Sequence, residues 1–155
     1  MKPLIVLVVT FIVANVFNRI RQGKAHLSLS GRVAMMAMLC FTAMGHFMFI
    51  DGMSAMLPDF VPAKNFIVLA TGVIEILFGI GLLISSITKW TGWLLILFFI
   101  AILPANIYAA IHSINYQTGE LNGPGVEYLW FRVPMQILFI GWVYYFTIRI
   151  RKSQI

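Results

Sequence analysis

The chain has 155 residues, of which 61% are hydrophobic and only 10% are charged. Soluble globular domains carry about 25% charged residues, so this composition excludes an ordinary soluble domain and predicts a single-domain integral membrane protein. The formal charge of +6 does not indicate nucleic-acid binding, because the basic residues lie at the ends of apolar runs rather than in one groove-reading element. Cys40 is the only cysteine, which excludes an internal disulfide and dithiol redox chemistry.

The first predicted element is a short transmembrane helix over about residues 3–20. No A-x-A cleavage pattern follows its apolar run, and the basic residues come after the run rather than before it, so a signal peptide is disfavoured. Arg19 can lengthen the helix by snorkelling to the inner interface. Asn15 and Asn18 lie near this end, where we expect interfacial water to solvate them.

Four further apolar segments follow a basic loop at residues 19–32. They cover about residues 32–50, 65–84, 90–111 and 127–148. The connector at 51–64 is too short and polar to span, and we expect it to lie along the outer membrane surface and cover a cavity with an apolar side. That side consists of Met53, Met56, Leu57, Phe60 and Val61. The predicted fold is an all-α membrane bundle with five spans.

The distribution of charge predicts the orientation of the bundle. If the loop at 19–32 is cytoplasmic, the same side also holds Lys89 and the C-terminus, and its charged residues are all basic: Arg19, Arg21, Lys24, Arg32, Lys89, Arg149, Arg151 and Lys152. The opposite side carries both signs of charge: Lys2, Lys64, Asp51, Asp59, Glu120 and Glu127. The positive-inside rule therefore predicts N-outside, C-inside in the cell membrane, or in the inner membrane if the chain is bacterial.

A single carboxylate, Glu75, lies in the middle of the third predicted helix. An ionisable side chain at that depth is costly, and it normally faces the bundle interior with a polar partner. Gly72, Glu75 and Gly79 are three and four residues apart, so they share one helix face. Because small residues let a second helix approach closely, we expect the other helices to pack around Glu75.

Four more polar side chains are predicted at a similar depth. His46 and Asn106 lie near the outer ends of the second and fourth helices, and Arg132 and Gln136 are one turn apart in the fifth. A rise of about 1.5 Å per residue places all of them, with Glu75, at the midplane or in the outer half of the bilayer. We predict that Glu75 and Arg132 face one interior space, either directly paired or bridged by the other three or by water, because burying either charge alone is costly.

Each of these residues also has a purely structural explanation. A lone His46 is more often packed or solvated than a ligand, Asn106 can cap the carbonyl that Pro104 frees, and Glu75 with Arg132 can fix packing alone. No metal is expected, because only His46 and Glu75 carry suitable groups. No nucleophile–base pair, phosphate loop or zinc signature occurs, so the catalytic residues, if there are any, are unknown.

Five short motifs follow one another along the chain. They are Gly45-His46-Phe47, Leu57-Pro58-Asp59-Phe60-Val61-Pro62, Gly72-Val73-Ile74-Glu75 with Gly79 and Gly81, Pro104-Ala105-Asn106-Ile107-Tyr108, and Leu129-Trp130-Phe131-Arg132-Val133-Pro134-Met135-Gln136. Together they resemble the DoxX family of small multi-pass membrane proteins, which is related to the group of the receptor-assembly chaperone NACHO. The resemblance implies a four-helix antiparallel core over about residues 31–148, to which the helix at 3–20 is an extra element.

Three functions remain open at this point. The first is a non-catalytic accessory or assembly protein that binds a partner protein or a lipid-like molecule, since the polar cluster contains no recognisable reactive group. The second, implied by the DoxX resemblance, is a subunit of a quinone-linked oxidoreductase, in which His46, Arg132 or Gln136 would bind a quinone carbonyl and Glu75 would exchange protons. The third is proton-coupled transport, which five helices without an internal repeat favour least.

Overall fold

The computed structural model describes residues 2–22 and 26–150, and this part of the chain contains six α-helices. They are α1 (Lys2–Gln22), α2 (Leu27–Met48), α3 (Ile50–Ala55), α4 (Lys64–Leu83), α5 (Thr88–Ile111) and α6 (Leu129–Val143). A 3₁₀ turn, η1 (Val126–Tyr128), precedes α6, and a π-helical segment, η2 (Tyr144–Arg149), continues it. Helices α1, α2, α4 and α5 and the segment Val126–Arg149 are long and apolar enough to cross a membrane, which confirms the predicted fold class.

The predicted basic loop at 19–32 is wrong, because most of it is helical. Arg19 and Arg21 lie in the last turn of α1, and α2 begins at Leu27. The apolar pattern ends before these helices do, because arginine and glutamine are good helix formers that extend a helix into the polar interface. Arg32 points into the bundle, where its guanidinium lies 3.4 Å from the Thr88 hydroxyl oxygen. Lys24, Arg151 and Lys152 lie outside the described residues.

Asn18 is buried rather than solvated at the interface. Its amide donates a hydrogen bond of 3.0 Å to the hydroxyl oxygen of Ser30 near the start of α2. The Ser28 hydroxyl donates to the carbonyl oxygen of Phe146 at 3.0 Å. These two hydrogen bonds connect α1 and η2 to the beginning of α2. The polar residues that made this region look like a loop in the sequence are therefore packed between helices at this end of the bundle.

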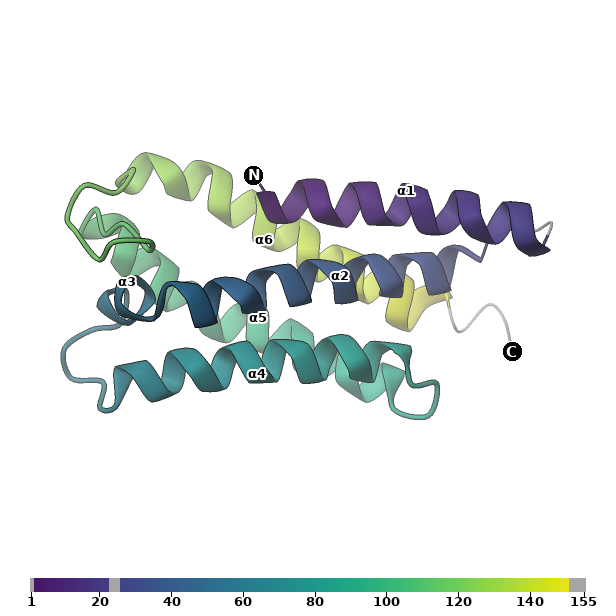
Figure 1. Ribbon diagram of the computed structural model, residues 1–155, viewed down its shortest axis with the longest axis horizontal. Helices are drawn as coiled ribbons and strands as arrows, with labels where there is room; N and C mark the ends of the chain where they lie inside the picture. Colours follow the sequence, from purple (N-terminus) through teal and green to yellow (C-terminus); the bar gives the residue numbers. More distant parts are fainter. Residues whose placement is uncertain (1, 23–25, 151–155) are drawn as a thin grey trace.

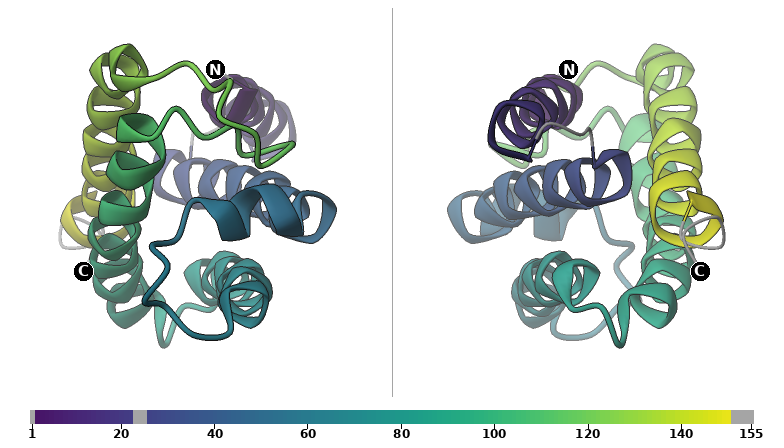
Figure 2. Two further views of the ribbon diagram at one scale, coloured as in Figure 1. Left: turned by 90° about the vertical axis from the view of Figure 1, so that its left-hand side faces the viewer. Right: turned by 90° about the vertical axis from the view of Figure 1, so that its right-hand side faces the viewer.

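The helices form two layers. Consecutive long helices run antiparallel, and α1, α2 and α4 lie one beside the next (Figure 1). Helices α5 and α6 form a second layer beside them, which is clearest when the bundle is viewed from either end (Figure 2). One end carries α3 and the loop 112–125, and the other carries the α4–α5 turn. The charge pattern predicts that the α3 end lies outside, and we use the name outer end for it from here on.

Glycines bring α2 and α4 close together. A Cβ atom added at Gly72 would lie 2.8 Å from Cβ of His46, and one added at Gly79 would lie 3.2 Å from Cγ of Met36. Both glycines and Glu75 are buried, so the face predicted from their spacing is the face that packs against α2. The short separation of the two helices sets Glu75 opposite the polar side chains of α2.

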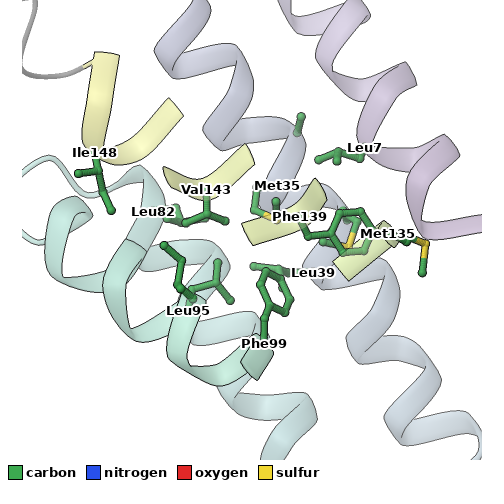
Figure 3. Packing of buried hydrophobic residues seen from close by; sticks show 13 residues of the cluster. Leu7, Met35, Leu39, Leu82, Leu95, Phe99, Met135, Phe139, Val143 and Ile148 are labelled. Carbon is green, nitrogen blue, oxygen red and sulfur yellow. The ribbon is translucent and has the colours of Figure 1, made fainter. Parts of the chain in front are cut away.

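The apolar core fills the middle and the inner half of the bundle. Its side chains come from α1, α2, α4, α5, α6 and η2 and point toward one another (Figure 3). They include Leu7, Met35, Leu39, Leu82, Leu95, Phe99, Met135, Phe139, Val143 and Ile148. Leu7 of α1 is fully buried in this cluster, so α1 contributes to the core rather than lying loosely on its surface.

Candidate functional site

The outer half of the bundle contains a cavity of about 660 Å³. Helices α2 and α4 form one wall, α5 and α6 form the other, and α3 with the loop 112–125 lies over the outer end. Its deepest lining residues are Met38, Phe99, Met135 and Phe139, which also belong to the apolar cluster; the last three are labelled in Figure 3. All five residues predicted from the sequence line this cavity: His46, Glu75, Asn106, Arg132 and Gln136.

Glu75 lies on the α4 wall and is only 4% exposed. Its Oε2 is 2.8 Å from the hydroxyl oxygen of Thr42, and its Oε1 is 3.7 Å from Nε2 of His46. Both partners belong to α2 and are one helical turn apart, so the close approach of α2 and α4 at Gly72 places them together against the carboxyl group. The carboxyl is therefore held from two directions by one neighbouring helix.

The contacts of His46 identify the nitrogen that carries its proton. Nδ1 lies 3.1 Å from the carbonyl oxygen of Val68 and 3.1 Å from the hydroxyl oxygen of Thr71, and that hydroxyl donates to the same carbonyl at 2.8 Å. A carbonyl only accepts, so Nδ1 is the donor. Nε2 then faces Oε1 of Glu75 at 3.7 Å.

Thr42 lies between Glu75 and the backbone of its own helix. Its hydroxyl oxygen is 2.8 Å from Oε2 of Glu75 and 3.0 Å from the carbonyl oxygen of Leu39. Thr42, His46, Thr71 and Glu75, here called the α2–α4 polar group, are thus connected by contacts among their own side chains.

A second polar group lies on the opposite wall. Nη2 of Arg132 donates a hydrogen bond of 3.0 Å to Oδ1 of Asn106, and the Asn106 amide donates to the carbonyl oxygen of Ile102 at 3.1 Å. Asn106 therefore does not cap the carbonyl freed by Pro104, which is that of Ile100, four residues before the proline. Its side chain instead joins the backbone of α5 to the guanidinium of α6.

Gln136 is buried one turn deeper on α6 than Arg132. Its amide nitrogen donates a hydrogen bond to the carbonyl oxygen of Phe99. This bond links α6 to α5 at the level where the cavity meets the apolar core. Gln136 thus lines the cavity while its amide nitrogen is hydrogen-bonded to the backbone of α5.

Direct pairing of Glu75 and Arg132, one of the two predicted arrangements, is not found among the described residues. The two side chains line the same cavity, but the partners of Glu75 are on α2 and the partner of Arg132 is on α5. Bridging of the two charges stays a prediction. Depth along a helix follows from sequence position, whereas the choice of partner depends on how each helix is rotated in the bundle.

The comparison with family models gives one match. The model of the domain of unknown function DUF8561 matches residues 35–147, which is most of the chain. The chain belongs to the DUF8561 family. No curated protein and no solved structure matches it. The DUF8561 region begins within α2 and extends into η2, so it contains both polar groups, whereas α1 lies before it.

Two threonines of the DUF8561 region belong to the site but were absent from the predicted set. Thr42 lies four residues before His46, and Thr71 lies four residues before Glu75, so each shares a helix face with a predicted residue. That spacing was the signal that could have found them. Lys2 of α1 also lines the cavity, although its position at the start of the chain gave no indication of this.

The connector at 51–64 contributes to the cavity only in part. It begins with α3, whose Gly52 packs against the backbone of Tyr116, and Met53, Met56 and Leu57 line the cavity. Phe60 is 86% exposed and does not line it, so the predicted apolar side is shorter than expected. Beyond it, Lys64 donates a 2.8 Å hydrogen bond to Asp59 that lowers the pKa of that exposed carboxyl.

No metal-binding cluster is present in residues 2–22 and 26–150. No group of three or more His, Cys, Asp or Glu side chains in these ranges is arranged to hold an ion.

Proposed function

We propose that this protein is a membrane accessory or assembly protein that binds a lipid-like molecule in the cavity of its outer half. The observation that carries the proposal is the contrast between the two halves of the bundle. The inner half contains the buried apolar cluster, whereas the outer half contains a cavity of about 660 Å³ between the two walls.

The lining has the character of a site for an apolar molecule with a polar end. Pockets that bind small molecules have volumes of about 300–1,000 Å³ and combine apolar walls with a few placed polar groups. Here the apolar part includes Met38, Phe99 and Phe139, and the polar part consists of the two groups on opposite walls. A lipid-like molecule can place its apolar portion on the core side and its polar portion between the walls.

The bilayer side gives such a molecule a route into the cavity. Phe41, Met44 and Met48 of α2 line the cavity, and 37%, 57% and 67% of their surfaces are accessible. A molecule dissolved in the bilayer can therefore reach the cavity past flexible methionine side chains. Entry from the membrane is the route expected for a ligand of low solubility in water.

The architecture is proposed to be of the DoxX type, with the N-terminus outside and the C-terminus inside the cell membrane. The order of the five sequence motifs supports the first part, and the basic residues at the end opposite α3 support the second. This orientation places the cavity in the outer leaflet.

A quinone-linked oxidoreductase subunit is the second candidate function. The observation that favours it is the α2–α4 polar group, in which His46 and Glu75 can hold or release a proton beside an apolar cavity. A quinone could accept hydrogen bonds from His46 or Arg132 there. The electrons would come from another chain.

Mass spectrometry of the molecules that co-purify with the protein tests both functions. We expect a lipid-like compound at about one molecule per chain in the wild type and its loss from Ala105→Phe, which adds a ring to the cavity wall. Ala101→Phe is the matched control, because Ala101 is exposed one turn away on the same helix and does not line the cavity. Quinone as the retained compound would favour the second function. A protein partner without any bound small molecule, or equal retention by both variants, would contradict the proposal.

A further inference from the structure

Arg132 carries a charge in the cavity that the described part of the protein does not neutralise. Its guanidinium donates a hydrogen bond to the neutral side chain of Asn106, and in the described ranges no carboxylate lies within ion-pair distance of it. A guanidinium has five N–H donors, so most of its hydrogen-bonding capacity is directed elsewhere. In a membrane-embedded cavity, such a cation normally has an anionic or strongly accepting partner.

Glu75 is not placed to be that partner. It is the only acidic residue of the lining, and its two oxygens face His46 and Thr42 on the opposite wall. Lys2 adds a second cation to the lining. Counting Lys2 and Arg132 as cations, Glu75 as a carboxylate and His46 as neutral, the described lining has a formal charge of +1. The cavity therefore favours a negatively charged group.

We infer that the ligand is an amphiphile with an anionic head group, a carboxylate or a phosphate, which binds Arg132 while its acyl chain lies against the apolar floor of the cavity. This inference rests on the proposed function and specifies the class of ligand. Arginine binds both kinds of head group through paired N–H donors, so the shared chemistry is an oxyanion with two acceptor oxygens.

The depth of the groups fits this orientation. Arg132 lies one turn from the outer end of α6, whereas Met135 and Phe139 lie one and two turns deeper. An amphiphile of the outer leaflet has its head group toward the outer surface and its chain toward the midplane. The head group would therefore lie at the depth of Arg132, and the chain at the depth of Met135 and Phe139. Asn106 holds the guanidinium from the α5 side and leaves its other edge available to the head group.

Three C16 amphiphiles distinguish the head groups: hexadecanoic acid, hexadecyl phosphate and hexadecanol. Their affinities are measured by native mass spectrometry on the delipidated full-length protein in one neutral detergent. We expect at least one of the two acids to bind ten-fold or more tightly than the alcohol, because a charge-assisted hydrogen bond contributes about 1.5–3 kcal/mol. The comparison between the two acids identifies the source: preference for the phosphate indicates a phospholipid-type head, and preference for the carboxylate indicates a fatty acid.

Substitutions of Arg132 test whether it is the residue that selects the anion. Arg132→Gln can keep the bond to Asn106 and should reduce the preference for the acid to about three-fold or less, whereas Arg132→Lys should keep most of it. Lys89→Gln, which removes an exposed cation at the far end of the bundle, should change nothing. Size-exclusion profiles and alcohol binding by Arg132→Gln report that the variant is folded.

The possible failures are distinguishable. If all three amphiphiles bind the wild type equally, or if Arg132→Gln retains the full preference, the anionic ligand is excluded while the lipid-binding function stands. If none of them binds and nothing co-purifies with the protein, the proposed function itself fails.

Discussion

At the scale of single residues, the two walls of the cavity differ in how far their polar groups are satisfied. Glu75, His46 and Thr42 satisfy one another across α2 and α4. Arg132 has only Asn106 among the described residues. The sequence could place these side chains at one depth, because depth follows from position along a helix. The sequence could not show which of these side chains are partners, because this depends on how each helix is rotated in the bundle. It also depends on Thr42 and Thr71, and a threonine fits equally well into an apolar helix that has no polar site.

Double-mutant cycles distinguish the observed pairing from a direct Glu75–Arg132 pair. For Glu75→Gln with His46→Gln we expect a coupling free energy of about 0.5–3 kcal/mol, because the two side chains are in contact. For Glu75→Gln with Arg132→Gln we expect additivity within about 0.5 kcal/mol, because the two side chains have different partners among the described residues. The measurement is the free energy of unfolding in mixed micelles. Coupling in the second cycle and additivity in the first would show that the charges pair across the cavity instead.

At the scale of elements, the contact between α2 and α4 determines the geometry of the α2–α4 polar group. The spacing of Gly72, Glu75 and Gly79 was sufficient to predict this contact face, because small residues at helical spacing have few other uses in a membrane bundle. The inner ends of α1 and α2 were mispredicted, since polar residues such as Asn18 and Ser30 satisfy one another within the helices. The short helix α3 was missed because six residues of mixed polarity carry no periodic signal.

Gly72→Ala is predicted to separate α2 from α4 at the polar group. Its new Cβ would lie 2.8 Å from Cβ of His46, an atom that cannot move without the backbone. We expect a loss of about 1–3 kcal/mol in the free energy of unfolding. Gly141→Ala is the control, because nothing lies within 4 Å of its added Cβ, and it should be neutral or stabilising by up to about 1 kcal/mol. Equal effects of the two changes would mean that the helices are not in close contact at Gly72.

At the scale of the whole molecule, the bundle combines a packed inner half with a hollow outer half. Composition and apolar run lengths were sufficient to predict five membrane-spanning helices. The cavity was expected only as a meeting point of polar residues, and its volume could not be predicted, because it depends on how α5 and α6 lie across the first layer (Figure 2). The functional assignment rests on this volume together with the orientation in the membrane.

The predicted orientation is tested by cysteine labelling in a Cys40→Ala background. Leu121→Cys lies in the loop 112–125 and Ser86→Cys in the α4–α5 turn, and both positions are exposed. An impermeant thiol reagent added to intact cells should label Leu121→Cys, and it should label Ser86→Cys only after the membrane is opened. The reverse pattern would place the cavity in the inner leaflet, and labelling of both positions in intact cells would reject the proposed topology.

The most direct test of the central claim is a crystal structure of the protein grown with 16-bromohexadecanoic acid, in which anomalous scattering locates the bromine atom. The account predicts one bromine site inside the cavity, on the core side near Phe99 and Phe139, with continuous density leading to a carboxylate at Arg132. A cavity that is closed by repacked side chains or filled only with water, with bromine confined to the outer surface of the helices, would contradict it.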